Sequence, residues 1–355
     1  MKYNKKTENL NAYMLQPTYG YKYRLDIGEW ELPLHPSIQE EIQSYHEICR
    51  YGAVNDDFKQ LIHEIQKYNG ITTEDNVLLT NGSDNALRLI LELFATPESK
   101  LLVPVPSYTH FESMLKVVNV KQLDKPYMNY RWSNQELNQF LLDELKQQYD
   151  VCYFVNPSMP IGHLLTTDNV QSMLTLYPDT LFIIDEAYLE FSEHQSCAPL
   201  IDQNNNLIVV KTFSKFFSLA SLRIGYLMTN PTFISLLKPL YNYKDITQLS
   251  VKCALSTLLH PDFYTENKKQ FFETKKYLIH ELTKIVQNNS KITDFIMNDG
   301  VYFTLICENP GELKTFFDGH SIAVRNKDCD IKGALRITVG IQETMEKVME
   351  ILKSY

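Results

Sequence analysis

The chain has 355 residues, of which 44% are hydrophobic and 22% charged, and these proportions are ordinary for a globular protein. They exclude collagen-like, coiled-coil and disordered chains. Its 43 acidic and 34 basic residues give a net charge of −9, which argues against a general binder of nucleic acid or of anionic membranes. The length exceeds the usual size of one hydrophobic core, so two packed domains are expected.

No targeting or membrane segment is visible in the sequence. The basic start, Met1 to Lys6, is not followed by an apolar stretch, and the longest apolar runs have the length of a strand. The six cysteines are scattered and form no Cys-x-x-Cys pair. We therefore expect reduced thiols in a cytoplasmic protein, not a disulfide framework or a zinc site, and we expect no metal.

The first part of the chain alternates short apolar runs with helical patterns. Ser37-Ile38-Gln39-Glu40 is a capping-box pattern that predicts the start of a helix. A second helix is predicted from about Asp56 to Tyr68, because Asn69-Gly70 is a stop signal. Later elements are expected at 77–80 (strand), 85–94 (helix), 101–105 (strand), from about 108 (helix), and at 151–155, 181–184, 207–210 and 224–228 (strands).

Strands that are apolar on both faces indicate a mostly parallel sheet covered by helices, and therefore an α/β fold. From about Pro231 the pattern changes to long helices over 246–287 and strands at 301–307, 321–324 and 335–339, which indicates a smaller α+β domain. We expect an N-terminal arm over 1–25, a large domain over 26–235 and a small domain over 236–355.

Asp185 ends the apolar run Leu181 to Ile184. In a parallel sheet, ligands bind beyond the carboxyl ends of the strands, so Asp185 is a candidate site residue. The alternative is that Asp185 only caps a turn or a helix.

A second candidate segment follows the strand at 207–210 and contains Ser214, Lys215 and Arg223. Lys215 is flanked by phenylalanines, and apolar surroundings lower the pKa of a lysine, which suits imine chemistry. Ser214 and Arg223 are residue types that bind phosphate. The alternative for any single lysine is a solvated surface charge.

Two further segments support a ligand site. Thr80-Asn81-Gly82-Ser83-Asp84 predicts a strand that turns through glycine into a helix, and such a helix start can cradle a phosphate. Ser83 could instead be only an N-cap. Tyr108 follows the strand at 101–105, where its ring could stack on a ligand or pack in the core.

Together these residues predict a ring-shaped cofactor that carries an aldehyde and a phosphate. Lys215 would form the imine, Asp185 would pair with a ring nitrogen, and Tyr108 would stack on the ring. Ser83, Ser214 and Arg223 would hold the phosphate. Pyridoxal 5′-phosphate (PLP) is the cofactor that fits this description, because its enzymes combine a Schiff-base lysine with an acidic partner for the ring nitrogen.

The chain resembles the fold type I PLP-dependent aminotransferases of class I/II, and most of all their histidinol-phosphate aminotransferase branch, from about Leu25 to the C-terminus. The matching pieces are Arg50-Tyr51, Asn81-Gly82-Ser83-Asp84, Pro106-Ser107-Tyr108, Asn156-Pro157 with Pro160-Ile161-Gly162, Asp185-Glu186-Ala187-Tyr188, Thr212-Phe213-Ser214-Lys215 with Arg223, and 335–340. The resemblance implies a large domain with a seven-stranded sheet and a homodimer with shared active sites.

The resemblance also implies roles for single residues. Lys215 would carry the cofactor and then move the Cα proton, and Asp185 would keep the ring nitrogen protonated. Tyr188 would donate a hydrogen bond to the phenolic oxygen of the cofactor. Tyr51 would reach the cofactor phosphate of the neighbouring subunit.

On the substrate side, Arg336 would bind the α-carboxylate, and Arg325 would meet a phosphate or carboxylate tail. The alternative for both arginines is a surface ion pair. The N-terminal tyrosines, Tyr13, Tyr19, Tyr21 and Tyr23, could cover the substrate or pack in a dimer.

The chain also departs from the family pattern. Met159 stands where the family has an asparagine that bonds the phenolic oxygen, Val301 replaces another asparagine near the substrate, and Gly28-Glu29-Trp30-Glu31-Leu32-Pro33 replaces Asn-Glu-x-Pro. With Met159, Tyr188 would be the main donor to the phenolic oxygen.

Three functions remain open at this point. The first is an aminotransferase that moves an amino group between an amino acid, with L-glutamate as the donor, and a keto or phosphorylated keto substrate in amino-acid biosynthesis. The second is a PLP-dependent decarboxylase of a phosphorylated amino acid, resembling threonine-phosphate decarboxylase. The third is a PLP-binding regulator, although the chain has no room for the added DNA-binding domain that such regulators carry.

Overall fold

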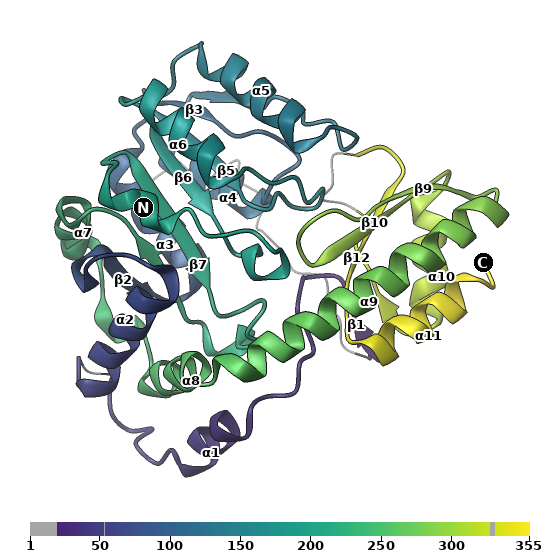
Figure 1. The fold of residues 1–355 in the computed structure, drawn as a ribbon, viewed down its shortest axis with the longest axis horizontal. Helices are drawn as coiled ribbons and strands as arrows, with labels where there is room; N and C mark the ends of the chain where they lie inside the picture. Colours follow the sequence, from purple (N-terminus) through teal and green to yellow (C-terminus); the bar gives the residue numbers. More distant parts are fainter. Residues whose placement is uncertain (1–19, 53, 327–330) are drawn as a thin grey trace, which may run out of the picture.

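The computed structural model describes residues 20–52, 54–326 and 331–355. Its largest sheet has seven strands and is mostly parallel (Figure 1), which confirms the predicted α/β class. The strand order is β2 (Val77–Thr80), β8 (Gly225–Met228), β7 (Leu207–Thr212), β6 (Leu181–Asp185), β5 (Val151–Val155), β3 (Lys100–Leu102) and β4 (Gln122–Asp124). Within this sheet β8 runs in the opposite direction to the other six strands.

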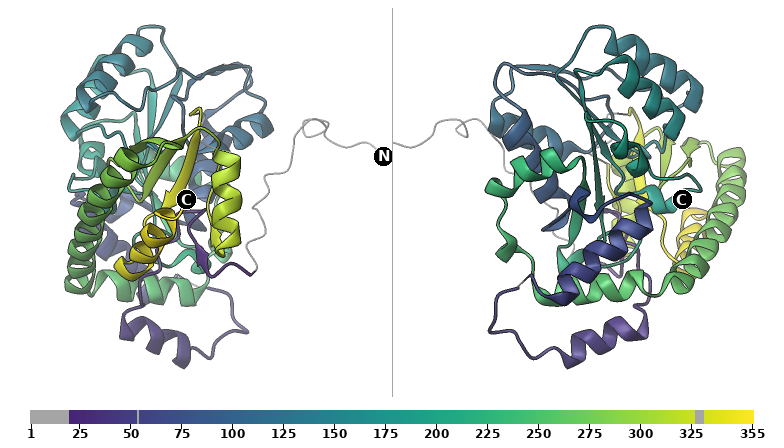
Figure 2. Two further views of the ribbon diagram at one scale, coloured as in Figure 1. Left: turned by 90° about the vertical axis from the view of Figure 1, so that its right-hand side faces the viewer. Right: turned by 60° about the vertical axis from the view of Figure 1, so that its left-hand side comes forward.

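The central strands β5, β6 and β7 are buried along their whole length, as a sheet covered on both faces requires. Helices lie on both sides of the sheet, as the edge-on view in Figure 2 shows. The helices of this part of the chain are α2 (Asp56–Asn69), α3 (Gly82–Phe94), α4 (Thr109–Val118), α5 (Asn134–Leu145), α6 (Thr167–Leu176), α7 (Pro231–Leu237) and α8 (Gln248–Leu258). A further helix, α1 (Pro36–Ser44), packs on α8 and lies away from the sheet (Figure 1).

Two helix ends test the predicted capping signals. The prediction for α2 is confirmed, because Asn55 accepts from the Phe58 N–H at its start and Gly70 adopts a left-handed conformation at its end. The helix predicted at Ser37 is present as α1, but Ser37 does not cap it. The helix begins at Pro36, since a proline suits the first helical position, where no N–H is needed. The cap is His35, whose side chain accepts from the Ser37 N–H.

The C-terminal part of the chain forms a second, antiparallel sheet, in agreement with its predicted α+β pattern. Its strand order is β12 (Ala334–Thr338), β10 (Tyr302–Cys307) and β9 (Ile292–Ile296). The helices α9 (Pro261–Asn288), α10 (Pro310–Gly319) and α11 (Gln342–Leu352) accompany it (Figures 1 and 2). The domain boundary predicted between residues 235 and 236 falls inside α7 and stays a prediction.

The segment before α1 connects the two sheets. Its short strand β1 (Tyr23–Arg24) pairs with β11 (Ile322–Ala323) beside the second sheet. Six residues later, Trp30 stacks on Phe216, which follows β7, and meets the edge of Phe271 on α9. This aromatic contact packs the N-terminal segment between the large sheet and the long helix. No helix in the described ranges has the length and apolar character that crossing a membrane requires.

Candidate active site

The predicted site residues gather beyond the carboxyl ends of the central strands. Asp185 is the last residue of β6, Lys215 follows β7, and Met159 follows β5. Gly82 begins α3 directly after β2. Arg336 comes from β12 of the second sheet, so the site lies where the two sheets face each other.

Asp185 is a buried carboxyl group held by two hydrogen-bond donors. Tyr153 donates its hydroxyl to Oδ2 at 2.9 Å, and the Ala187 N–H donates to Oδ1 at 3.1 Å. Burial raises the pKa of Asp185 to about 6, against the lowering effect of these hydrogen bonds. The carboxyl group is therefore poised to accept a cationic partner, which would offset its desolvation.

Tyr153 is a site residue that the sequence did not reveal. It lies in the middle of β5, opposite Ile183 of β6, and its ring stacks on Phe111 with the ring centroids 3.7 Å apart. In the sequence it is one aromatic residue in a buried strand, and only the register of β5 against β6 brings its hydroxyl to Asp185.

Lys215 lies between the N-terminal segment and Tyr188. Its ammonium donates to the Ile27 carbonyl at 2.9 Å and lies 5.6 Å from the centroid of the Tyr188 ring. The phenylalanines that flank it in sequence pack with one another and with Trp30. The immediate polar contact of Nζ thus comes from the backbone of the segment before α1, which no motif indicated.

A small cradle forms between the start of α3 and the loop that carries Ser214 and Arg223. Arg223 donates to the Ser214 hydroxyl at 3.4 Å. Gly82 has a φ of +71°, and a Cβ there would lie only 2.6 Å from Nη2 of Arg223. The cap residue Asn81 makes no side-chain hydrogen bond to the helix. The start of α3, the Ser214 hydroxyl and the Arg223 guanidinium therefore lie close together, and such a group of donors suits an anion.

Asp84 connects this cradle to Tyr108. It accepts from the Tyr108 hydroxyl at 2.8 Å and lies 3.8 Å from Nη2 of Arg223 and 3.7 Å from Nδ1 of His110. Burial acts to raise the pKa of Asp84, but the hydrogen bonds from His110 and Tyr108 and the charge of Arg223 hold it below its usual range. Asp84 thus orients Arg223 and fixes the Tyr108 hydroxyl.

Arg336 is buried, with 3% of its surface exposed, and donates to the Asp26 carbonyl at 2.6 Å. Its guanidinium carbon lies 4.5 Å from the centroid of the Tyr302 ring. Arg325 forms a β-bridge with Arg336 through two backbone hydrogen bonds of 3.0 and 2.7 Å. Because directly opposed residues of an antiparallel pair project to the same face, the side chains of both arginines lie on one face of the bridge.

Tyr188 is buried beside Lys215, and its hydroxyl has two polar neighbours. The hydroxyl of Tyr302 lies at 3.1 Å and the sulfur of Met159 at 3.5 Å. Burial raises the pKa of Tyr188 well above 10, so the phenol stays protonated. The sequence predicted Tyr188 and Met159 at this place, but it gave no signal for Tyr302.

Tyr51 is not brought to these residues. It lies on the loop between α1 and α2 with 78% of its surface exposed, and the contact found for its ring is the Lys244 ammonium at 5.5 Å. Of the predicted N-terminal tyrosines, Tyr13 and Tyr19 lie outside the described residues, whereas Tyr21 donates to Asp318 and Tyr23 belongs to β1.

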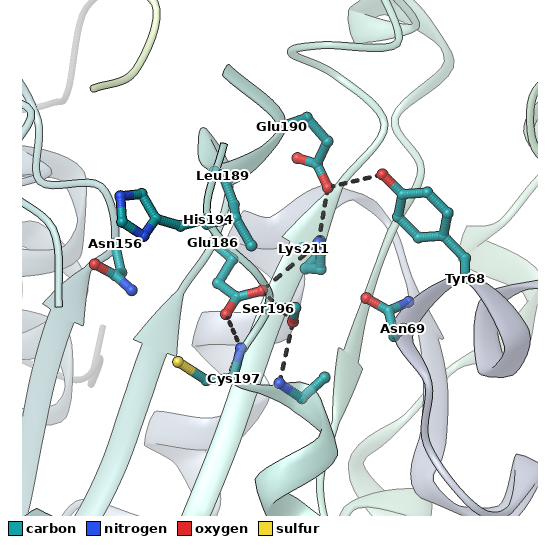
Figure 3. A network of polar contacts seen from close by, with 12 residues as sticks. Tyr68, Asn69, Asn156, Glu186, Leu189, Glu190, His194, Ser196, Cys197 and Lys211 are labelled. Carbon is teal, nitrogen blue, oxygen red and sulfur yellow. Dashed lines mark hydrogen bonds and ion pairs between the residues drawn. The ribbon is translucent and has the colours of Figure 1, made fainter. Parts of the chain in front are cut away.

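A second polar network lies next to the site on β6 and β7 (Figure 3). Lys211 is buried and forms ion pairs with Glu190 at 2.7 Å and with Glu186 at 3.5 Å. Glu186 also accepts from Ser196 and from the Cys197 N–H. Burial acts to lower the pKa of Lys211, but the charges of Glu190 and Glu186 raise it well above 10.5. This network fixes the chain that follows Asp185, including Tyr188.

Comparison with known proteins was made for the whole chain. The sequence profile described as Aminotransferase class I and II matches residues 24–352. The chain is 28% identical over 302 residues to the histidinol-phosphate aminotransferase of Buchnera aphidicola, and this match covers 83% of this chain and 82% of the relative. It is also 28% identical over 367 residues to the dihydroxyacetone phosphate transaminase of Campylobacter jejuni, and this match covers 100% of this chain and 97% of the relative.

Two solved structures have a similar fold. The histidinol-phosphate aminotransferase from Clostridium acetobutylicum matches with a TM-score of 0.81 at 21% identity, over 94% of this chain and 98% of that one. The L-threonine-O-3-phosphate decarboxylase from Porphyromonas gingivalis matches with a TM-score of 0.79 at 19% identity, over the same 94% and 98%. At these identities the two structures show that the fold is shared.

Proposed function

The chain belongs to the family of class I and II aminotransferases, and from that membership we propose that it transfers an amino group from L-glutamate to a phosphorylated keto substrate. The observation that carries the proposal is the placement of Lys215 and Asp185 after the ends of the paired strands β7 and β6, with a cradle formed by Gly82, Ser214 and Arg223 at the same edge of the sheet. Enzymes of this family use PLP, and the arrangement offers a group for each end of that cofactor.

The residues fit the cofactor by their chemistry. Asp185 is a buried carboxyl group suited to a protonated ring nitrogen, and the Tyr188 phenol is suited to the phenolic oxygen. The cradle residues, with Ser83 at the start of α3, would hold the phosphate, Asp84 would orient Arg223 and the Tyr108 hydroxyl around the cofactor, and Tyr108 would lie against the ring. PLP supplies an electron sink that accepts the electrons of a broken bond at the substrate Cα.

The chain's own residues then handle protons and orientation. Lys215 is the amine that would bind the cofactor, and once displaced its Nζ would take the proton from the substrate Cα and deliver it to C4′ of the cofactor. Asp185 would hold a proton on the ring nitrogen throughout, since the hydrogen bonds from Tyr153 and Ala187 favour its charged form. Lys215, Asp185 and Tyr188 are therefore the proposed catalytic residues.

The arginine pair supports the choice of substrate. Arg336 is buried and would bind the α-carboxylate, and Arg325 lies beside it on the same face, where it could meet a second anionic group. Two relatives of this chain are named for phosphorylated substrates, histidinol phosphate and dihydroxyacetone phosphate. We infer that Arg325 binds the phosphate of such a substrate.

Two matched pairs of substrates test this proposal. With 2-oxoglutarate as the amino acceptor, we expect histidinol phosphate to react more efficiently than histidinol. With L-glutamate as the amino donor, we expect dihydroxyacetone phosphate to react more efficiently than dihydroxyacetone. A charge-assisted contact to phosphate contributes about 1.5–3 kcal/mol, so kcat/KM is expected to differ by about tenfold to a hundredfold. Arg325→Gln is expected to reduce this preference and leave the dephosphorylated substrates unaffected.

Equal rates for the phosphorylated and dephosphorylated members of both pairs would contradict the assignment of Arg325. Release of carbon dioxide from a phosphorylated amino acid, without amino transfer to a keto acid, would favour the decarboxylase instead. The threonine-phosphate decarboxylase fold shows that the same architecture hosts that reaction in another protein.

We also propose that two copies of the chain form a homodimer in the cytoplasm. Ile48, Tyr51 and Val54 expose 82%, 78% and 56% of their surfaces on one loop, and a neighbouring subunit would cover them. Tyr51 would then reach the phosphate cradle of the partner. The five described cysteines are free thiols, which suits a reducing compartment. A solution mass of one chain would contradict the dimer.

A further inference from the structure

Tyr302 lies at a point where several active-site elements meet, although no motif singles it out. It begins β10, and its side chain is buried with 5% of its surface exposed. Its hydroxyl lies 3.1 Å from the Tyr188 hydroxyl, and its ring lies beneath the Arg336 guanidinium at 4.5 Å. The rings of Tyr302 and Tyr188 meet edge to face, with their centroids 5.4 Å apart.

Gly28 provides the space that the Tyr302 hydroxyl occupies. A Cβ on Gly28 would collide with that hydroxyl and would lie 3.4 Å from Nζ of Lys215. Gly28 has a φ of +70°, and its N–H donates to the Thr338 hydroxyl at 3.1 Å, which fixes the segment against β12. A residue with a side chain here would push the hydroxyl away from Tyr188 and would strain the backbone as well.

The chemistry of the two neighbours of Tyr188 decides which of them can assist it. A thioether sulfur accepts a weak hydrogen bond and cannot donate one, so Met159 cannot donate to the Tyr188 oxygen. Tyr302 can donate, since a phenol both donates and accepts. When Tyr188 turns its own proton toward an acceptor in the site, Tyr302 is the neighbour able to donate to the oxygen that remains.

We propose that Tyr302 is a positioning residue that donates a hydrogen bond to Tyr188 and so holds its phenol in place to donate to the phenolic oxygen of the cofactor. The proposal rests on the proposed use of PLP. A chain of two hydrogen bonds polarises the central hydroxyl and makes it a stronger donor. Tyr188 would then stabilise the negative charge on the cofactor oxygen, although Met159 contributes no donor.

The test is a pH titration of the visible absorption of the PLP-loaded enzyme. Tyr302→Phe removes the hydroxyl and keeps the ring against Arg336. It weakens the donor that stabilises the charged oxygen, so the pKa of the bound chromophore is expected to rise by about half a unit to one unit. Tyr177→Phe is the matched control, because it removes a hydroxyl that donates to the Leu142 carbonyl between α6 and α5, and no shift is expected.

A second background shows whether Tyr302 acts through Tyr188. Met159→Asn restores the amide that, in the family, bonds the phenolic oxygen of the cofactor, so that Tyr188 is no longer the main donor to this oxygen. In that background Tyr302→Phe is expected to shift the pKa by less than half as much as it does with Met159 present. In the Tyr188→Phe background it is expected to cause no further shift. Gly28→Ala, which displaces the hydroxyl without removing it, is expected to raise the pKa as Tyr302→Phe does.

The outcomes separate this proposal from the proposed function. A yellow enzyme whose titration is unchanged by both Tyr302→Phe and Gly28→Ala overturns the role of Tyr302 and leaves the cofactor assignment standing. The same is true if Tyr302→Phe causes an equally large shift in the unaltered chain and in the Met159→Asn and Tyr188→Phe backgrounds. A protein that takes up no PLP overturns the proposed function, and this proposal with it.

Discussion

At the scale of single residues, the pKa of Asp185 gives the site a measurable pH dependence. Its carboxyl group is buried and hydrogen-bonded, and no ion pair to it is found in the described part of the chain. Burial therefore raises its pKa from 3.8 to about 6. The folded cofactor-free protein binds this proton more tightly than the unfolded chain does, so Asp185 costs stability as the pH rises from about 4 to about 6.

Asp185→Asn is expected to stabilise the cofactor-free protein above pH 6. An amide carries no charge; its oxygen can accept from the Ala187 N–H, and its NH2 group can donate to the Tyr153 hydroxyl, which accepts as well as donates. The pKa difference of about two units corresponds to about 3 kcal/mol at neutral pH. Thermal unfolding of both proteins should therefore coincide near pH 4 and diverge as the pH rises to 7, with the variant more stable. A gap that stays constant or closes over this range would contradict the buried, unpaired state of Asp185.

The residues with chemical signatures could be found in the sequence, and those defined by position could not. Asp185, Ser214, Lys215 and Arg223 stand next to strand ends in a spacing that indicates a ligand site. Tyr153 and Tyr302 are aromatic residues inside strands, where a buried core position is the ordinary expectation. Their hydroxyls matter because of strand register and because of the space at Gly28, which a single sequence does not record.

At the scale of elements, the strands that are apolar along their length were predictable, and the strands that carry polar residues were not. The prediction for β2 and β5 matches residue by residue, because each is a short apolar run between turn signals. The edge strand β4 contains Gln122 and Asp124, and β9 contains Thr293 and Asp294. Such polar strands lack the apolar pattern, and pairing with a neighbour defines them.

The ion-pair network of Lys211 joins β7 to the chain that follows β6. Lys211→Met leaves the carboxylates of Glu186 and Glu190 buried without their cation, and breaking a buried pair in this way costs about 3–5 kcal/mol. The thermal unfolding temperature is expected to fall by several degrees. Lys252→Met is the matched control, because Lys252 also bridges two acids, Glu41 and Asp57, but is partly exposed, so about 1 kcal/mol or less is expected. Equal losses for the two variants would contradict the importance of burial.

At the scale of the whole molecule, the site depends on the two sheets and on the segment that joins them. The large sheet supplies Asp185 and Lys215, the small sheet supplies Arg336 and Tyr302, and residues 26–28 contact both sets. The sequence predicted both regions and their order. It did not predict that the N-terminal segment would contribute backbone groups to the site, because carbonyl acceptors carry no residue signature.

The central claim is that this chain is a PLP-dependent aminotransferase that uses Lys215. The most direct test is the absorption spectrum of the purified protein, loaded with PLP, before and after excess L-glutamate. A yellow band that bleaches with glutamate and returns with 2-oxoglutarate is the predicted result, and Lys215→Ala should not cycle in this way. Failure of the protein to develop the yellow band even after addition of PLP would contradict the account.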